Sequence, residues 1–326
     1  MPPVFQGIVT ILVGVGGCIA YFWVSNWLLD RVIFPARGPN IGRNINRANL
    51  LRPWLFMFPA IFVLGLYLAY PVFGSFVRSL YNRAGTEFIG LGNYMTLFAE
   101  AGFRTAVFNN FLWLLVVPAA ATALGLLAAQ LTDRLSWGNI AKSMIFMPMA
   151  ISFVGASLIW KFVYANNADI GLINAIRDLL GAERPVDVIQ IPFWNNFFLM
   201  FILIWIQTGF AMVILSAALR GIPEETIEAA ILDGAGPVRL FFSVKVPQIM
   251  GTIVVVWTTI TILVLKVFDI VYTMTGGNFG THILPSYMMS FMFRDDGRAT
   301  AVAFVIMLIV LPVMVWNIAQ ARRDMR

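Results

Sequence analysis

Acidic side chains gather in one polar stretch of an otherwise apolar sequence, residues 217–250. The acids there are Glu224, Glu225, Glu228 and Asp233. Clustered carboxylates serve acid–base catalysis or metal binding, most often beside histidine or cysteine. The chain contains one histidine, His282, and one cysteine, Cys18, and it has no Gly-Lys dipeptide that would end a phosphate-binding loop. We therefore expect no catalytic residue, no metal site and no cofactor bound by this chain, and we interpret the acidic stretch as a surface held by another protein.

The polar stretch carries its own helix signals. Pro223 is suited to the first turn of a helix, the two acids after it favour the positive N-terminal end, and Gly234 offers a C-cap. These signals predict a helix of about ten residues. Gly236 and Pro237 start a second helical stretch, which we expect to run until Pro247. Two short helices at an angle should result.

The composition places the rest of the chain in a membrane. Of the 326 residues, 60% are hydrophobic and 12% are charged, which leaves far too much apolar surface for a soluble fold of this size. We predict an all-α integral membrane protein with about seven transmembrane helices, since a helix needs about 20 residues to cross about 30 Å of hydrocarbon. The spans are expected at about residues 6–29, 53–73, 106–131, 143–164, 192–216, 249–273 and 299–319.

The first predicted span stands apart from the others. An arginine-rich stretch, residues 30–52, separates it from the later spans, which follow one another as a single hydrophobic series. We therefore divide the chain into two parts. Residues 1–52 form a peripheral first helix with a basic cytoplasmic linker, and residues 53–326 form a transmembrane domain that contains the cytoplasmic loop 217–248.

Cations set the expected orientation, because short cytoplasmic loops retain Lys and Arg. Five arginines follow the first span: Arg31, Arg37, Arg43, Arg47 and Arg52. The N-terminus is therefore expected outside and the C-terminus in the cytoplasm, with Arg134, Lys142 and Arg220 on the inside. The pI of about 9.7 is explained by inner cations that meet anionic lipid, so we expect no nucleic-acid partner. The first apolar segment lacks a basic start and a small-residue cleavage site, so we expect it to be retained.

Polar and aromatic side chains share one depth in the two spans that flank the polar loop. At 1.5 Å per residue, Gln207 lies about 22 Å below the outer end of its span and Thr259 about 15 Å above the inner end of the next. Polar groups are costly there unless they face water or each other, and sugars bind to such groups beside aromatic faces. The predicted substrate path comprises Trp205, Gln207, Thr208, Phe210, Trp257, Thr258, Thr259 and Thr261. The alternative is that the threonines bond back to their own helix carbonyls and the aromatics pack or face lipid.

Lys266 and Asp269 are three residues apart near the outer end of a predicted span. On one helix face they would form an ion pair that offsets the cost of inserting each charge. Lys266 is expected to snorkel toward the outer surface. We favour a structural pair over a role in substrate binding or gating. His282 is expected to be a surface side chain of an outer loop.

The polar loop resembles the EAA loop of bacterial ATP-binding-cassette importer permeases. The resemblance rests on the spacing of Glu228, Ala229, Ala230, Gly234, Val244, Val246 and Pro247. In that family the loop supplies a coupling helix that sits in a cleft of a separate ATPase subunit. The resemblance implies ATPase-coupling roles for Glu228, Ala229, Ala230, Asp233, Gly234 and Pro247.

Further motifs are similar to those of sugar-permease subunits in this family. They are Phe88-Ile89-Gly90-Leu91-Gly92-Asn93-Tyr94, Phe146-Met147-Pro148, Trp160, Gly171-Leu172-Ile173-Asn174, Phe268-Asp269 and Thr275-x-Gly276-Gly277. Among these subunits the chain resembles the first of two kinds, and alpha-glucoside permeases most closely, although it has no room for the large outer domain of some maltose-type subunits. Asn278 stands where the family usually has proline, and Val264 and Val267 replace polar residues of maltose-type permeases. The family's sugar contacts are therefore not carried over as a set.

The resemblance implies an importer-permease fold in the bacterial cytoplasmic (inner) membrane and a role in carbohydrate uptake. The implied partners are a second homologous permease in a heterodimer, two ATPase subunits that bind ATP and Mg, an extracytoplasmic sugar-binding protein and membrane lipid. The implied substrate is an alpha-glucoside such as maltose, sucrose or trehalose. Two other classes stay open. An ion-coupled secondary transporter would use Asp269 as its ion site, and a membrane enzyme acting on a lipid-linked sugar would need clustered acids, which occur only in the polar loop.

Overall fold

The computed structural model describes residues 3–35, 41–133, 135–182 and 184–324. Within these ranges the regular secondary structure is helical, apart from an isolated antiparallel bridge between Tyr81 and Phe88, which confirms the predicted all-α fold class. The chain forms two compact units, Met1–Gly74 and Ser75–Arg326. The functional division that we placed after residue 52 stays a prediction. Arg37 and Arg134, two of the predicted inner cations, lie outside the described residues.

The first unit consists of long apolar helices. These are α1 (Pro3–Leu28) with a π turn after it (Leu29–Ile33), and α2 (Ile41–Leu64), which continues through a π turn (Gly65–Ala69) into the first half of α3 (Tyr70–Ser79). The Tyr21 hydroxyl donates to the Leu55 carbonyl at 3.0 Å, and an ion pair joins Arg52 to Asp30 at 2.7 Å. Residues 41–52, predicted as linker, are helical, because residues 43–52 contain neither glycine nor proline to stop the helix.

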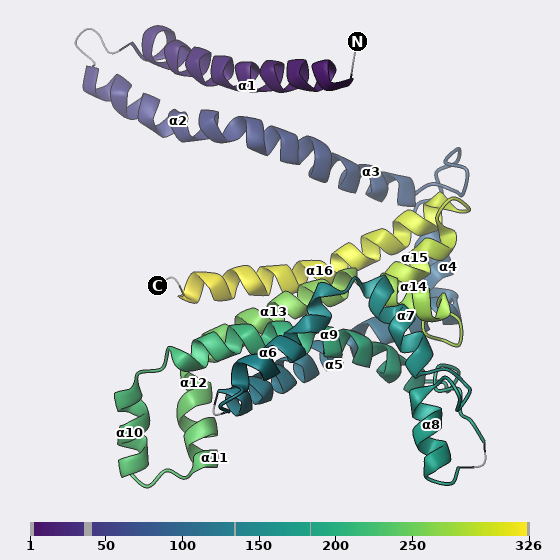
Figure 1. The fold of residues 1–326 in the computed structure, drawn as a ribbon. Helices are drawn as coiled ribbons and strands as arrows, with labels where there is room; N and C mark the ends of the chain where they lie inside the picture. The colour runs from purple at the N-terminus through teal and green to yellow at the C-terminus, as the bar shows by residue number, and fades with distance from the viewer. Residues whose placement is uncertain (1–2, 36–40, 134, 183, 325–326) are drawn as a thin grey trace. The chain divides into compact units, whose positions relative to one another are not determined.

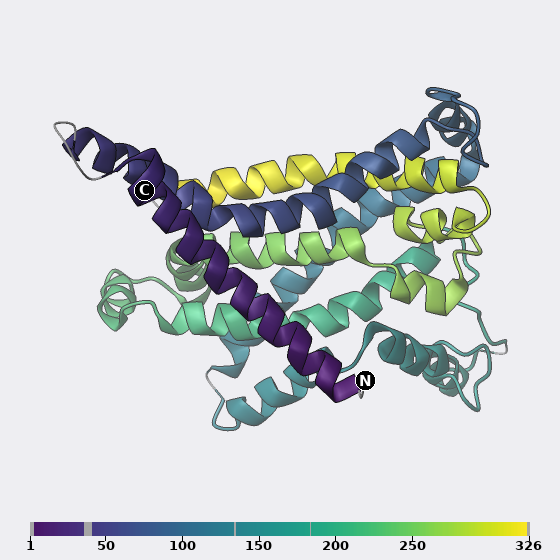
Figure 2. The same ribbon diagram turned by 90° about the horizontal axis from the view of Figure 1, so that it is seen from above.

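The second unit is a bundle built around α5 (Ala101–Thr132) and α9 (Trp194–Arg220), the helices with the most extensive mutual contact (Figure 1). Its buried core includes Trp113 and Val117 of α5 with Leu203 and Met212 of α9. The other helices are α4 (Gly92–Ala99), α6 (Gly138–Phe146), α7 (Phe153–Val163), α8 (Leu172–Leu179), α10 (Glu224–Leu232), α11 (Pro237–Leu240), α12 (Val246–Gln248), α13 (Met250–Lys266), α14 (Asp269–Thr275), α15 (Leu284–Phe291) and α16 (Asp296–Asp324). Figures 1 and 2 both place α10 and α11 at one end of this bundle and α8 at the other.

The candidate membrane spans are either single long helices or pairs of helices with a bend between them. Five described helices are long and apolar enough to cross a membrane: Val4–Ile33, Ile41–Ser79, Ala101–Thr132, Trp194–Arg220 and Asp296–Trp316. Two bent pairs, Gly138–Ala150 with Phe153–Val163 at 105° and Pro237–Gln248 with Met250–Lys266 at 72°, raise the number to seven if each pair is one span. The predicted span 143–164 is wrong as a continuous helix, because Pro148 and the extended backbone of Ile151 (φ −91°, ψ 137°) interrupt it.

Glycines allow the central helices to pack backbone against backbone. A Cβ on Gly125 of α5 would lie 2.4 Å from the Ala211 Cβ of α9. A Cβ on Gly209 of α9 would lie 2.6 Å from the Ile145 carbonyl oxygen and 2.8 Å from the Phe146 Cα of α6. Small residues at such crossings are typical of helix packing in membranes. The helices α5, α6 and α9 are therefore held closely together.

Gly209→Ala is expected to destabilise the bundle, because the new methyl group meets backbone atoms of α6 that cannot rotate away. Overpacking of this kind costs about 1–3 kcal/mol, or a fall of about 2–4 °C in melting temperature per kcal/mol for a domain of this size. Thermal unfolding of the purified chain measures the effect. Gly251→Ala in α13 is the matched control, since a Cβ there meets no atom within 4 Å. Equal melting temperatures for the two variants would contradict the packing described above.

Candidate functional site

Residues 217–248 fold as the two short helices predicted from their sequence. We call this segment the coupling loop, after the role that the family resemblance predicts for it. The first helix, α10, spans Glu224–Leu232, and α11 begins at Pro237 after its N-cap Gly236. Pro223 is the N-cap of α10 and not a residue of its first turn. The two acids of that first turn lie where the helix dipole favours negative charge.

The first helix of the coupling loop ends at a left-handed glycine. Gly234 has φ +82°, its N–H donates to the Ile231 carbonyl at 3.0 Å, and the Ala235 N–H donates to the Ala230 carbonyl at 3.0 Å. This pair of hydrogen bonds is the Schellman motif, which satisfies carbonyls at the helix end. A Cβ on Gly234 would meet no atom within 4 Å, so the backbone conformation, not the space around it, requires glycine.

The coupling loop presents an uncovered surface. Of its predicted coupling residues, Ala230 is half-buried and the exposed ones are Glu228, Ala229, Asp233, Gly234 and Pro247. Large apolar side chains beside them are also uncovered, since Leu232 is 88% exposed and Val238 is 71% exposed. Ile227 of α10 packs against the main core. Pro247 lies apart from the other predicted residues, in α12. Uncovered apolar surface of this kind is compatible with contact by a partner, and the coupling roles of these residues stay predictions.

A charged cluster that sequence reasoning missed lies where α9 enters the coupling loop. One carboxylate oxygen of Asp133, the residue after α5, accepts hydrogen bonds from Lys142 Nζ, from Ser216 Oγ at 3.1 Å and from Arg220 Nη2 at 3.0 Å. Lys142 Nζ also donates to Ser216 Oγ at 2.7 Å. We call Asp133, Lys142, Ser216 and Arg220 the Asp133 cluster. It joins the ends of α5 and α9 to α6.

The charge of Asp133 is stable at neutral pH. Burial alone would raise the pKa of Asp133, but hydrogen bonds from Lys142, Arg220 and Ser216 outweigh it and hold the pKa below the ordinary value of 3.8. A lowered pKa contributes stability above the unfolded-state value, and this contribution is lost as the pH falls through the folded-state value. One signal in the sequence could have identified Asp133: an acid at the C-terminal end of a helix opposes the helix dipole and needs compensating cations.

A cavity beside α9 takes in only part of the predicted substrate path. Trp205 and Thr208 line a cavity of about 560 Å³ together with side chains of α5 and α6, among them Leu127 and Met144. The other six predicted residues are not in its lining. Gln207 is 5% exposed, and its side chain forms no hydrogen bond with a described residue. These positions stay predictions as substrate contacts.

The threonines of the predicted path donate to their own helices. The hydroxyls of Thr208 and Thr261 donate one turn back at 2.7 and 2.8 Å, and those of Thr258 and Thr259 share the Val255 carbonyl at 3.0 and 2.8 Å. This is the alternative that the sequence left open. Each hydroxyl oxygen can still accept a hydrogen bond from a solute.

The predicted pair of Lys266 and Asp269 is not formed in the described structure. The helix α13 ends at Lys266, the extended backbone of Val267 (φ −64°, ψ 128°) follows, and Asp269 opens α14. The two residues therefore do not share a helix face, which was the basis of the prediction. His282, predicted to be a surface side chain, is half-buried, and its Nδ1 lies 3.2 Å from Ser286 Oγ. The His282 ring packs against Gly277, since a Cβ on that glycine would lie 2.0 Å from the His282 Cε1 atom.

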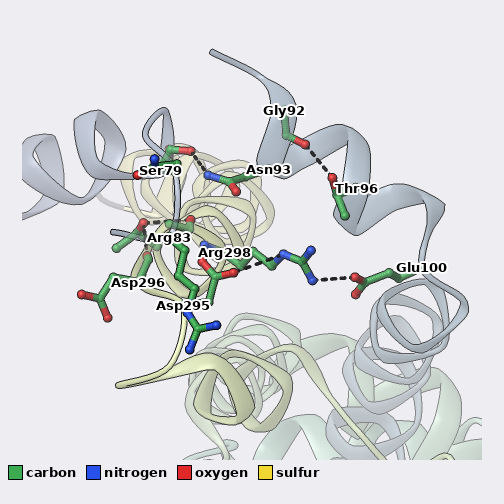
Figure 3. A network of polar contacts seen from close by, with 12 residues as sticks. Ser79, Arg83, Gly92, Asn93, Thr96, Glu100, Asp295, Asp296 and Arg298 are labelled. Atoms are coloured by element: carbon green, nitrogen blue, oxygen red, sulfur yellow. Dashed lines mark hydrogen bonds and ion pairs between the residues drawn. The ribbon is translucent and has the colours of Figure 1, made fainter. Parts of the chain in front are cut away.

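At the other end of the bundle, a polar network joins α4 and α5 to α15 and α16 (Figure 3). Glu100, between α4 and α5, accepts from Arg298 Nη1 at 2.8 Å and from the Tyr287 hydroxyl at 2.6 Å. Arg298 Nε also lies 3.4 Å from Asp295. Nearby, Asn93 donates to the Ser79 carbonyl at 2.8 Å (Figure 3). Asn93, a motif residue that carried the family resemblance, therefore acts as a structural brace.

Asn174, the last residue of the Gly-Leu-Ile-Asn motif, is such a brace. Its amide donates to the Ala165 carbonyl at 2.8 Å and the Val186 carbonyl at 3.0 Å, and its oxygen accepts from the Val186 N–H at 2.7 Å. Asn174→Ala leaves these buried groups unpaired at a cost of about 1–3 kcal/mol. We expect a lower melting temperature in thermal unfolding, while exposed Asn166→Ala leaves it unchanged. An unchanged value for both would remove the bracing role.

Comparisons with known proteins agree with this architecture. Residues 121–323 match the family described as binding-protein-dependent transport system inner membrane component. The alpha-glucoside transport system permease protein AglF of Rhizobium meliloti is 58% identical over an alignment of 334 positions, which covers 99% of each chain. The osmoprotective compounds uptake permease protein GgtC of a Synechocystis species is 46% identical over 270 residues, 81% of this chain and 96% of that one.

A solved structure shares the fold. It is the crystal structure of a bacterial alginate ABC transporter in complex with an alginate pentasaccharide-bound periplasmic protein, and the similar chain has a TM-score of 0.70 at 21% identity. The match covers 87% of this chain and 98% of that one. The predicted importer-permease fold is therefore confirmed.

Proposed function

Since the chain belongs to the family of binding-protein-dependent transport system inner membrane components, we propose that it forms half of the translocation path of an ATP-driven sugar importer in the bacterial inner membrane. ATP hydrolysis takes place on a separate chain. The coupling loop makes the contact with that chain, so this subunit is not itself an enzyme.

The observation that supports the coupling role is the exposure of α10, the first helix of the coupling loop. Glu228 and Ala229 are exposed on α10, Gly234 ends the helix with two capping hydrogen bonds, and Leu232 is uncovered. A short helix with an exposed apolar side chain at its tip fits a cleft in a partner, as helix-in-groove recognition requires. Closure of two ATPase subunits would then move this helix and rock the bundle between inward- and outward-facing states.

The substrate that we propose is an alpha-glucoside such as maltose, sucrose or trehalose. The support is the name of the 58% identical relative, an alpha-glucoside permease. An extracytoplasmic sugar-binding protein would deliver the sugar, and a second homologous permease would complete the path as a heterodimer. The N-terminus would lie outside and the C-terminus in the cytoplasm. This orientation puts the coupling loop on the side where ATP is present.

The experiment is a pull-down of the tagged chain from native membranes, followed by an ATPase assay of the eluate. The assay is run with maltose, sucrose and trehalose, each with the matching binding protein. We expect an ATPase and a second permease to be recovered, and one sugar to stimulate hydrolysis. Recovery of the chain alone, under conditions that preserve complexes, would contradict the proposal. It would favour an ion-coupled transporter, with Asp269 as the residue to test.

A further inference from the structure

Both ends of the coupling loop are attached to the cytoplasmic end of one helix, α5. Arg220, the last residue of α9, donates to Asp133, which directly follows α5. On the return side, Lys245 donates to Gln130 of α5 at 3.4 Å. We infer that Asp133 is the positioning residue that transmits movement of the coupling loop to α5 and α6. The inference rests on the proposed function and adds to it the route by which the loop acts on the bundle.

Few contacts other than these attachments connect α10, the first helix of the coupling loop, to the bundle. Among the described residues of α10, Ile227 alone packs against the main core, and the tip of the helix around Leu232 is uncovered. A partner that shifts α10 therefore acts on the membrane helices mainly through the chain segments at its two ends. The entering segment is the one that the Asp133 carboxylate holds.

Beyond Asp133 the connection is rigid. Lys142 extends the cluster to α6, and Gly138 lets α6 start against α5, since a Cβ there would lie 2.1 Å from the Thr132 carbonyl oxygen. The tight glycine contacts of α5 and α6 with α9 prevent these helices from sliding past each other. Displacement of Arg220 should therefore move α5, α6 and α9 together.

The cluster depends on its one negative charge. Asp133 lies between two cations, Lys142 and Arg220, and its side chain is 21% exposed, so solvent screens these interactions only in part. With an amide in place of the carboxylate, the two cations have no anion between them and repel each other. The attachment of the coupling loop then loosens, while the packed glycine contacts remain.

The test uses the complete complex in proteoliposomes. The variants are Arg220→Gln, Asp133→Asn and Asp133→Glu, with Asp178→Asn on exposed α8 as the control. For each variant, uptake of maltose, sucrose and trehalose, ATPase activity with and without sugar-loaded binding protein, and recovery of the ATPase subunit are measured. Arg220→Gln is the variant that spares folding, because the Arg220 side chain is 61% exposed and Asp133 keeps its bonds to Lys142 and Ser216.

We expect Arg220→Gln and Asp133→Asn to lower both uptake and sugar-stimulated hydrolysis by at least about fivefold, the lower end of typical coupling effects. Unstimulated hydrolysis and recovery of the ATPase subunit should stay unchanged, and Asp133→Glu should restore most of the uptake. Wild-type uptake in Arg220→Gln and Asp133→Asn would overturn the inference. Loss of the ATPase subunit from both variants would also overturn it, because the cluster would then shape the docking surface. Failure of the wild-type chain to recover an ATPase would instead refute the proposed function itself.

Discussion

Gly234→Val is expected to reduce sugar uptake strongly. The φ of +82° at this position is strained for every L side chain and most strained for a β-branched one, at a cost of about 1–3 kcal/mol. The end of α10 would unwind to relieve the strain, and the exposed residues beside Gly234 would lose the arrangement that the partner contacts. A cost of this size corresponds to a loss in coupling of about 5- to 150-fold.

A graded series separates backbone conformation from other effects at Gly234. Asparagine tolerates the left-handed region better than alanine, so uptake should decrease in the order Gly, Asn, Ala, Val. Gly236→Ala is the control, because Gly236 has an ordinary φ of −68° and no atom within 4 Å of an added Cβ. Membrane insertion should be equal for all variants. Equal uptake for Gly234→Val and Gly236→Ala would show that the cap has no part in coupling.

Features that depend on local chemistry could be predicted from the sequence. Pro223 and Gly234 mark the start and the end of a helix whether or not that helix contacts anything else. The residues from Pro223 to Gly234 were therefore enough to predict α10. The long apolar stretches that became α5 and α9 were found in the same way, by hydropathy and length. Resemblance to a family then gave these elements a function, which no local signal contains.

Features that depend on packing could not be predicted. The break at Val267 contains neither glycine nor proline, so no local signal separated Lys266 from Asp269. The 105° bend after α6 has a proline at its start, but the size of the angle depends on what α7 packs against. The Asp133 cluster joins residues 83 and 87 positions apart in the chain, and only the folded bundle brings them together.

The second large effect is expected from Leu232→Asp. Leu232 is 88% exposed at the end of α10, so its replacement leaves the interior of the permease unchanged. Apolar anchors of this kind dominate the energy of interfaces, and a hot spot contributes about 2 kcal/mol or more to binding. In the complex, the aspartate would also place an unpaired charge in an apolar pocket of the ATPase. We expect the yield of ATPase subunit in the pull-down, and sugar uptake with it, to fall by at least about tenfold, since each 1.4 kcal/mol is a factor of ten.

A matched leucine at the other end of the bundle makes the Leu232 result interpretable. Leu179 ends α8 and is 86% exposed. In Figures 1 and 2, α8 lies at the end of the bundle opposite the coupling loop. Leu179→Asp introduces the same charge at the same exposure, so a general effect on insertion or solubility would appear in both variants. Loss of the ATPase subunit from Leu232→Asp alone assigns the contact to the coupling loop. If both variants retained it, the uncovered apolar tip of α10 would not be the surface that the ATPase binds, and the exposed acid at Glu228 would have to carry the contact without it.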